Sequence, residues 1–328
     1  MEQKILRVST MVIVGALLLR LLSNVVPPIT VSPEFASFMF FLQTGRLIRP
    51  ANITFSPAPE ETLPVTEQPA EPSLPSPTEP ALLTFSPDAA ESLTINCSFD
   101  YSADLPALLT QPLSWDLIGE APTVLILHSH ATESYTGTYQ ETTAYHTLDI
   151  EQNLISIGSH LASLLEDGGI RVLHDTKLHD SPSYNDAYIN SRSSAQDYLN
   201  KYPSIRLVLD LHRDSYEDDE GNQIVRTVFS QGTQLAQLMF VVGTDYAGYE
   251  HPDWQDNLAL ALKLQTQLEG ICPGICRSIN LRSQRFNQDL SPGSLLIEIG
   301  ACGNTRQEAL LAAEVLAEGI LSLANGSK

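Results

Sequence analysis

Apolar and polar positions follow two regular patterns along most of the chain. Short, strongly apolar runs have the length of buried strands, at 123–127, 170–173, 205–211, 237–242 and 294–299. Longer segments between them repeat apolar residues every three or four positions, which predicts helices at about 151–166, 185–200, 254–268 and 306–323. A weaker alternation at 93–99 is consistent with one more short strand. This order of elements predicts an α/β sandwich in which one central sheet, mostly parallel or mixed, has helices on both faces.

The beginning of the chain has a different pattern, a largely apolar run at 8–26. About 20 such residues in a helix are enough to cross a bilayer core. Lys4 and Arg7 precede the run, so the positive-inside rule puts the N-terminus in the cytoplasm. Arg20 weakens this assignment, but it lies close to the outer end, where its side chain can reach the interface. We expect a transmembrane anchor at 1–27 rather than a cleaved signal peptide, because no small-x-small cleavage site follows closely.

Two further segments separate this anchor from the periodic part of the chain. Residues 28–49 include a short apolar stretch that we expect to lie at the membrane surface. Residues 50–90 are rich in Pro, Glu, Thr and Ser, a composition that is typical of a disordered and extended linker. The folded part is therefore expected at 91–328, held away from the membrane on its outer side. Such a tether suits a substrate layer outside the bilayer, for example a cell wall.

Charge and cysteine content narrow the function. The net charge is −21, from 39 acidic and 18 basic residues, which argues against a nucleic acid as partner. Four cysteines in 328 residues indicate no disulfide framework.

Chemically versatile side chains follow or interrupt three of the predicted strands. The stretch "LILHSHATE" contains His128, His130 and Glu133, and "LVLDLHRDS" contains His212 and Arg213. Ligands of open α/β sheets bind where strands end, so these segments are expected to meet. Two histidines, a carboxylate and one water form a common catalytic zinc site.

A buried carboxylate beside such a site suits a general base. Glu298 is the charged residue within the apolar strand "SLLIEIG", where burial is expected to raise its pKa. Each part also has a structural explanation: a single histidine at a strand end is often only hydrogen-bonded, and Glu298 would be stabilised by an ion pair with Arg213 or Arg285.

Several segments resemble the stage II sporulation protein P family in the same order and with similar gaps. They are "VLILHSHATESY", "LEDGGIRVLHDTKLHDSPSYNDAYINSR", "IRLVLDLHRDS", "QLMFVVGTD", "HPDWQDNLALALKL" and "RSQRFNQDLSPGSLLIEIGACGNTRQEA". The resemblance implies a membrane-anchored, zinc-dependent N-acetylmuramoyl-L-alanine amidase of the amidase-3 type. It would cut peptidoglycan between the glycan lactyl group and the stem peptide during sporulation engulfment. The implied location is the mother-cell engulfing membrane, facing the intermembrane wall space, with the stage II sporulation proteins D and M as partners.

The resemblance also implies roles for individual residues. Alignment to the amidase-3 pattern favours His130 over His128 as one zinc ligand and matches His212 with the second histidine. The carboxylate ligand is expected to be Glu133, with Glu151 as the alternative.

In the implied mechanism, zinc polarises the amide carbonyl and lowers the pKa of its water. Glu298 then passes the water's proton to the departing L-alanine nitrogen. Arg213 is expected to hold a stem-peptide carboxylate, unless it clamps Asp210 or Glu298 instead. A peptidoglycan metallo-endopeptidase and a non-catalytic wall-binding scaffold remain the competing functions.

Overall fold

The computed structural model describes residues 85–113, 116–136, 145–220 and 223–326. The chain divides into two compact units, 1–73 and 74–328, and all described residues belong to the second. The predicted membrane anchor at 1–27, the segment at 28–49 and most of the linker at 50–90 lie outside the described residues. Among the helices of the described ranges, none is long and apolar enough to cross a bilayer.

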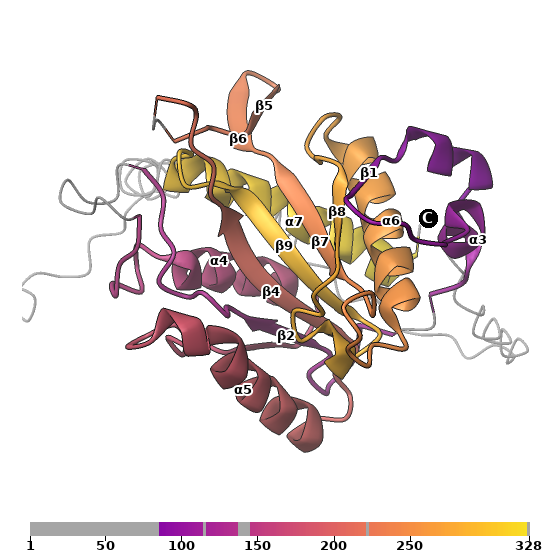
Figure 1. The fold of residues 1–328 in the computed structure, drawn as a ribbon, viewed down its shortest axis with the longest axis horizontal. Helices are drawn as coiled ribbons and strands as arrows, with labels where there is room; N and C mark the ends of the chain where they lie inside the picture. The colour runs from indigo at the N-terminus through magenta and orange to yellow at the C-terminus, as the bar shows by residue number, and fades with distance from the viewer. Residues whose placement is uncertain (1–84, 114–115, 137–144, 221–222, 327–328) are drawn as a thin grey trace, which may run out of the picture. The chain divides into compact units, whose positions relative to one another are not determined.

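One seven-stranded sheet forms the centre of the described part, in the order β1-β8-β7-β9-β4-β2-β3 (Figure 1). Its strands are β1 (Ile95–Cys97), β2 (Val124–Leu127), β3 (Val172–His174), β4 (Leu207–Asp214), β7 (Leu238–Gly243), β8 (Ile279–Arg282) and β9 (Ser294–Ala301). Neighbouring strands run parallel except for β7 and β9, which pair antiparallel. The predicted central sheet is confirmed, and it is mixed.

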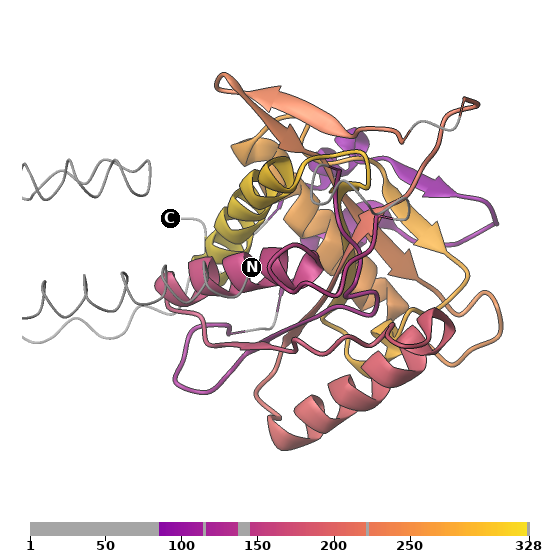
Figure 2. The same ribbon diagram turned by 90° about the vertical axis from the view of Figure 1, so that its left-hand side faces the viewer.

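Helices cover both faces of this sheet, as predicted (Figure 2). The helices α4 (Leu154–Asp167), α6 (Trp254–Ile271) and α7 (Arg306–Asn325) share the main hydrophobic core with one face, and α5 (Ala187–Lys201) packs on the other. Strand β2 shows the division, because Ile126 belongs to the main core and Leu127 packs in a second cluster with Ala195 of α5. A strand that is apolar on both faces is typical of the middle of such a sheet.

Side-chain caps fix the helix boundaries more sharply than periodicity does. The helix predicted from about residue 151 begins at Leu154, because the side chain of Asn153 accepts a hydrogen bond from the backbone N–H of Ile155. The closing helix α7 begins after Thr305, which forms a reciprocal capping box with Glu308.

Other described elements do not follow from the apolar pattern. They are α3 (Leu105–Thr110), the antiparallel hairpin of β5 (Thr227–Ser230) and β6 (Thr233–Ala236), strand β8, and the short 3-10 helices η1 (Pro87–Ser92), η2 (Tyr184–Asp186) and η3 (Gln288–Leu290). The folded part therefore already begins by Pro87, slightly before the predicted boundary at 91.

Candidate active site

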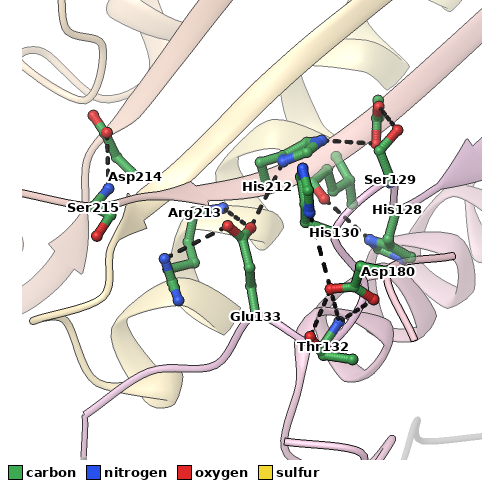
Figure 3. Close-up of polar contacts among 12 residues, drawn as sticks. His128, Ser129, His130, Thr132, Glu133, Asp180, His212, Arg213, Asp214 and Ser215 are labelled. Atoms are coloured by element: carbon green, nitrogen blue, oxygen red, sulfur yellow. Dashed lines mark hydrogen bonds and ion pairs between the residues drawn. The ribbon is translucent and has the colours of Figure 1, made fainter. Parts of the chain in front are cut away.

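Strands β2, β4 and β9 run parallel, so their carboxyl ends lie at one edge of the sheet. His212 on β4 and Glu298 on β9 are direct partners in the register. Along these strands Val208 and Leu296 pack away from the main core, on the sheet face that carries α5. Because side chains alternate along a strand, His212 and Glu298 point to this same face. The loop that follows β2 lies beside them and contributes His130 and Glu133 (Figure 3).

Glu133 is the carboxylate that lies beside His212. It is buried, and its Oε2 lies 3.7 Å from Nδ1 of His212. The backbone N–H of Arg213 donates to the same oxygen at 3.2 Å, and Nη1 of Arg213 lies 3.5 Å from Oε1. Burial raises the pKa of Glu133 although Arg213 and His212 act to lower it. The alternative ligand Glu151 is exposed and has no described contact with His130 or His212.

His212 is held from its other side by a second carboxylate. Oδ1 of Asp210, two residues earlier on β4, lies 3.0 Å from Nε2 of His212. Ser129 fixes this carboxylate, because its backbone N–H donates to Asp210 at 2.8 Å and its hydroxyl at 2.6 Å. Burial opposes a charge on the ring, but the carboxylates of Asp210 and Glu133 raise the pKa of His212 to about 10. Nδ1 of His212 is thus left facing Glu133.

The two histidines after β2 have different surroundings. The Nδ1 of His128 lies 3.2 Å from the carbonyl oxygen of Leu211, and its Nε2 lies 2.9 Å from Nε2 of His174 on β3. A carbonyl only accepts, so Nδ1 of His128 carries its proton, and Nε2 accepts from His174. Burial, with His174 nearby, lowers the pKa of His128 to about 3, so this ring is a neutral part of the interior.

His130, in contrast, lies against His212, with ring centroids 5.5 Å apart. Its ring also stacks on Tyr184 at 4.1 Å. Its buried Nδ1 has no hydrogen-bond partner among the residues that the structure describes, and Oδ2 of Asp180 is 4.0 Å away. Of the two histidines after β2, His130 is therefore the one whose ring packs on the ring of His212.

Glu298 has a carboxylate without an ion pair in the described part of the chain. The residue is half-buried, and its buried Oε2 has no hydrogen-bond partner. Burial, aided by Glu133 and opposed by His212, raises the pKa of Glu298 to about 8. Arg285, a suggested structural partner, instead lies 3.3 Å from Asp289. An unpaired buried acceptor of this kind is unusual in a purely structural role.

Arg213 is buried and fully engaged with the protein. Its Nε donates to the carbonyl of Ser134 at 2.9 Å and its Nη2 to the carbonyl of Tyr145 at 2.7 Å, in addition to its contacts with Glu133. Each nitrogen of its guanidinium thus already has a partner within the protein. The expected contact with a stem-peptide carboxylate stays a prediction. The structural alternative fits better, but the partner is Glu133 rather than Asp210 or Glu298.

The donor set suits zinc in its chemistry. Two imidazoles and a carboxylate, from His130, His212 and Glu133, are typical zinc ligands. A ligating histidine usually gives its second ring nitrogen to a carboxylate, and Asp210 lies 3.0 Å from Nε2 of His212, an ion-pair contact without hydrogen-bond geometry. Within the described residues, however, no three such side chains already converge on a common metal position. The zinc assignment therefore rests on the kinds of groups present and on the unpartnered Nδ1 of His130.

Two residues of the site were not singled out from the sequence. Asp180 accepts hydrogen bonds from the backbone N–H and the hydroxyl of Thr132 and so holds the loop that carries His130.

Tyr188, near the start of α5, is the second of these residues. It stacks over His212 with an interplanar angle of 12° and a centroid distance of 6.3 Å. Burial and the carboxylates of Asp210, Glu298 and Glu133 raise the pKa of Tyr188, so its hydroxyl stays a donor. Both lie in the block "LHDSPSYNDAYINSR", but no local pattern distinguishes them from other polar residues.

Comparison with known proteins adds evidence on the family. The curated stage II sporulation protein P of Bacillus subtilis (strain 168) is 26% identical over 212 residues, 61% of this chain and 50% of that protein. The chain thus matches about half the length of this relative. Similar solved structures include an N-acetylmuramoyl-L-alanine amidase from Clostridium difficile 630, with 17% identity, a TM-score of 0.39, and 64% of this chain and 100% of that chain covered.

Another similar structure is the CwlD amidase from Clostridioides difficile in complex with the GerS lipoprotein. It has 15% identity and a TM-score of 0.38, and the match covers 61% of this chain and 94% of that chain. These two structural similarities are too distant to carry an argument about activity. The family model described as stage II sporulation protein P (SpoIIP), however, matches residues 70–321, more than half of the 328 residues. The resemblance noted in the sequence is confirmed, and the chain belongs to the stage II sporulation protein P family.

Proposed function

We propose that this chain is a zinc-dependent N-acetylmuramoyl-L-alanine amidase, which hydrolyses the amide between N-acetylmuramic acid and L-alanine in peptidoglycan. The observation that carries the proposal is the unpaired carboxylate of Glu298 beside His212, which in turn lies 3.7 Å from Glu133. Membership of the sporulation family supports cell-wall peptidoglycan as the substrate.

In this proposal His130, His212 and Glu133 hold the zinc ion. The bound ion supplies a Lewis acid for the amide carbonyl and lowers the pKa of water. Glu298 accepts a proton from the attacking water on its unpartnered Oε2 and donates it to the departing L-alanine nitrogen. Asp210 keeps Nδ1 of His212 turned toward Glu133, and Arg213 keeps the Glu133 carboxylate in place.

The cellular setting is part of the same proposal. The predicted anchor at 1–27 and linker at 50–90 support a single-pass location in the cell membrane, with the catalytic part on the outer side. The mother-cell engulfing membrane, and the stage II sporulation proteins D and M as partners, follow from the family resemblance.

Digestion of peptidoglycan tests the activity directly. The purified chain is incubated with sacculi, with and without a zinc chelator, and the released fragments are identified by mass spectrometry. We expect intact stem peptides with a free N-terminal alanine, and we expect them to disappear on chelation. Cuts only within stems or cross-links would indicate an endopeptidase. Absence of any product while sacculi are still bound would favour a wall-binding scaffold.

A further inference from the structure

A surface groove adjoins the candidate active site on the side of α5. Its volume is about 360 Å³, within the range common for ligand sites. It lies between the first turns of α5 and the segments that follow β7 and β8, and it is lined by Tyr188, Ile189, Arg192, Tyr249, Gln284, Arg285, Phe286 and Asn287. Tyr188 belongs to both places, because its ring also stacks over His212. A ligand in the groove would therefore continue directly into the candidate site.

The groove is locally basic, although the chain has a net charge of −21. Its two charged lining residues are Arg192 and Arg285, and both contact one carboxylate, Asp289. Arg192 binds Asp289 through two hydrogen bonds, of 2.8 and 2.7 Å, whereas Arg285 reaches it by one contact of 3.3 Å. Asp289 alone does not balance two guanidinium groups, and Arg285 is the more exposed of the two arginines. The side chain of Arg285 is 33% exposed, so its remaining N–H donors are accessible to an anion.

Aromatic and aliphatic side chains flank this charge. The guanidinium of Arg285 lies 5.3 Å from the ring centroid of Tyr249, a residue that is 52% exposed. Ile189 on the opposite side is 71% exposed. Phe286 packs on Tyr188, with ring centroids 5.7 Å apart. Exposed apolar side chains grouped around a cation suit a ligand that has both aliphatic parts and a carboxylate.

The backbone that presents Arg285 is held in an unusual conformation. Phe286 and Asn287 both have positive φ, 49° and 58°, a conformation that asparagine tolerates but that is costly for phenylalanine. The segment is fixed by Asn287, whose Nδ2 donates to the carbonyl of Tyr188 at 2.8 Å. Gln288 fixes it on the other side, because its amide bonds the backbone of Val241 and Gly243. Strain that is kept in place by such contacts is common at binding sites, and here it sets the position of Arg285 beside α5.

We propose that this groove binds the peptide part of the substrate, with Arg285 holding a free side-chain or α-carboxylate of the stem peptide. The inference rests on the proposed amidase function, because it places the peptide on the side of Tyr188 and the scissile amide beside Glu298. It also gives the substrate carboxylate a cation that Arg213, bound to Glu133, does not supply.

The test compares two small substrates that differ only in charge. These are N-acetylmuramoyl-L-alanyl-D-glutamic acid and its diamide, in which both carboxylates are carboxamides. Arg285→Gln removes the cation, while Arg192 still neutralises Asp289. Arg171→Gln removes the same charge from an exposed position next to β3, and it serves as the matched control. We measure kcat/KM on the full chain for both substrates, and by calorimetry the Kd of free L-alanyl-D-glutamate and of its diamide.

We expect the unaltered chain to prefer the diacid by roughly tenfold, as for one charge-assisted hydrogen bond. Arg285→Gln should abolish this preference, mainly by raising KM for the diacid, and should raise the Kd of free L-alanyl-D-glutamate by the same factor. Arg171→Gln should keep the preference. The groove assignment would be overturned if the unaltered chain had equal kcat/KM values for diacid and diamide, or if the preference survived in Arg285→Gln. Either result would leave the amidase proposal intact. Arg285-dependent binding of the dipeptide without any cleavage would instead support the groove and count against the amidase.

Discussion

His212 and Glu298 are direct partners in the parallel pairing of β4 and β9. The pairing places an imidazole held by Asp210 next to a carboxylate with an unpartnered oxygen, on rigid central strands. Two adjacent strands keep these groups in register without help from a loop. The proposed base therefore has a fixed position relative to His212, one of the proposed ligands, which proton transfer requires.

Replacing Glu298 with glutamine tests its role as base. Glu298→Gln keeps the shape of the side chain and removes the proton acceptor, so kcat should fall by roughly 10²- to 10⁴-fold. Zinc content, measured by atomic emission, should stay unchanged, because Glu298 is not one of the proposed ligands. Glu166→Gln, at an exposed position of α4, is the matched control and should keep full activity. If Glu298→Gln retained turnover, the assignment of the base would be wrong.

A double-mutant cycle tests whether Arg213 serves to hold Glu133. Arg213→Met alone leaves a buried carboxylate without its cation, and it should lower the free energy of unfolding by about 3 kcal/mol or more. Adding Glu133→Gln removes the charge that needs compensation, so the double variant should lose clearly less than the sum of the two single changes. The measurement is urea unfolding of the four proteins. Strict additivity would mean that the contact of Glu133 with Arg213 is energetically unimportant.

The strands and helices of the sheet follow from the sequence because their apolar runs are long and regular. Strand β8 has four residues, and in the strands of the β5–β6 hairpin only Leu235 and Ala236 are buried, so neither has an apolar pattern strong enough to predict it. The sequence also does not decide between His128 and His130 as a zinc ligand, for a different reason. Strand β2 ends at Leu127, so alternation no longer fixes where the two rings point. His174 on β3 and His212 on β4 decide it, and these contacts join residues distant in sequence.

The position of Arg285 illustrates the same limit. It was expected only as a possible partner of Glu298, and the structure pairs it with Asp289, four residues later. Two positive φ angles follow it directly, at Phe286 and Asn287, and no glycine marks them in the sequence. Backbone conformation that depends on hydrogen bonds from Asn287 and Gln288 is set by the assembled fold.

Lys263 on α6 should make stability depend on pH. Its side chain is buried and donates to the carbonyl of Leu108, and burial lowers the pKa of Lys263 from 10.5 to about 8. The unfolded chain therefore holds this proton more tightly, so the free energy of unfolding should rise between pH 8 and 10.5 and be lowest below pH 8. The full effect is roughly 3 kcal/mol at most.

Comparison with a methionine variant isolates this contribution. The stability of the unaltered chain minus that of Lys263→Met should increase across the same pH interval, measured by urea unfolding at several pH values. Groups other than Lys263 titrate in both proteins and cancel. Lys201→Met, at an exposed position at the end of α5, should show no such change. If the difference in stability between the unaltered chain and Lys263→Met did not change with pH, burial would not lower the pKa of Lys263.

Gly158 gives a test of the neutral histidine pair that supports the loop after β2. It lies in the middle of α4, where replacing glycine with alanine normally stabilises a helix by about 0.5–1 kcal/mol. Here a Cβ would lie 2.5 Å from Nε2 of His128 and 2.6 Å from Nε2 of His174. Both rings are held by hydrogen bonds, so Gly158→Ala should instead lower the free energy of unfolding by roughly 1–3 kcal/mol. Gly270 of α6 has no atom near its Cβ position, so Gly270→Ala should be neutral or stabilising in the same urea unfolding experiment. A stabilising Gly158→Ala would show that His128 and His174 move apart at little cost, which would remove the argument that this pair fixes His128 away from the zinc ligands.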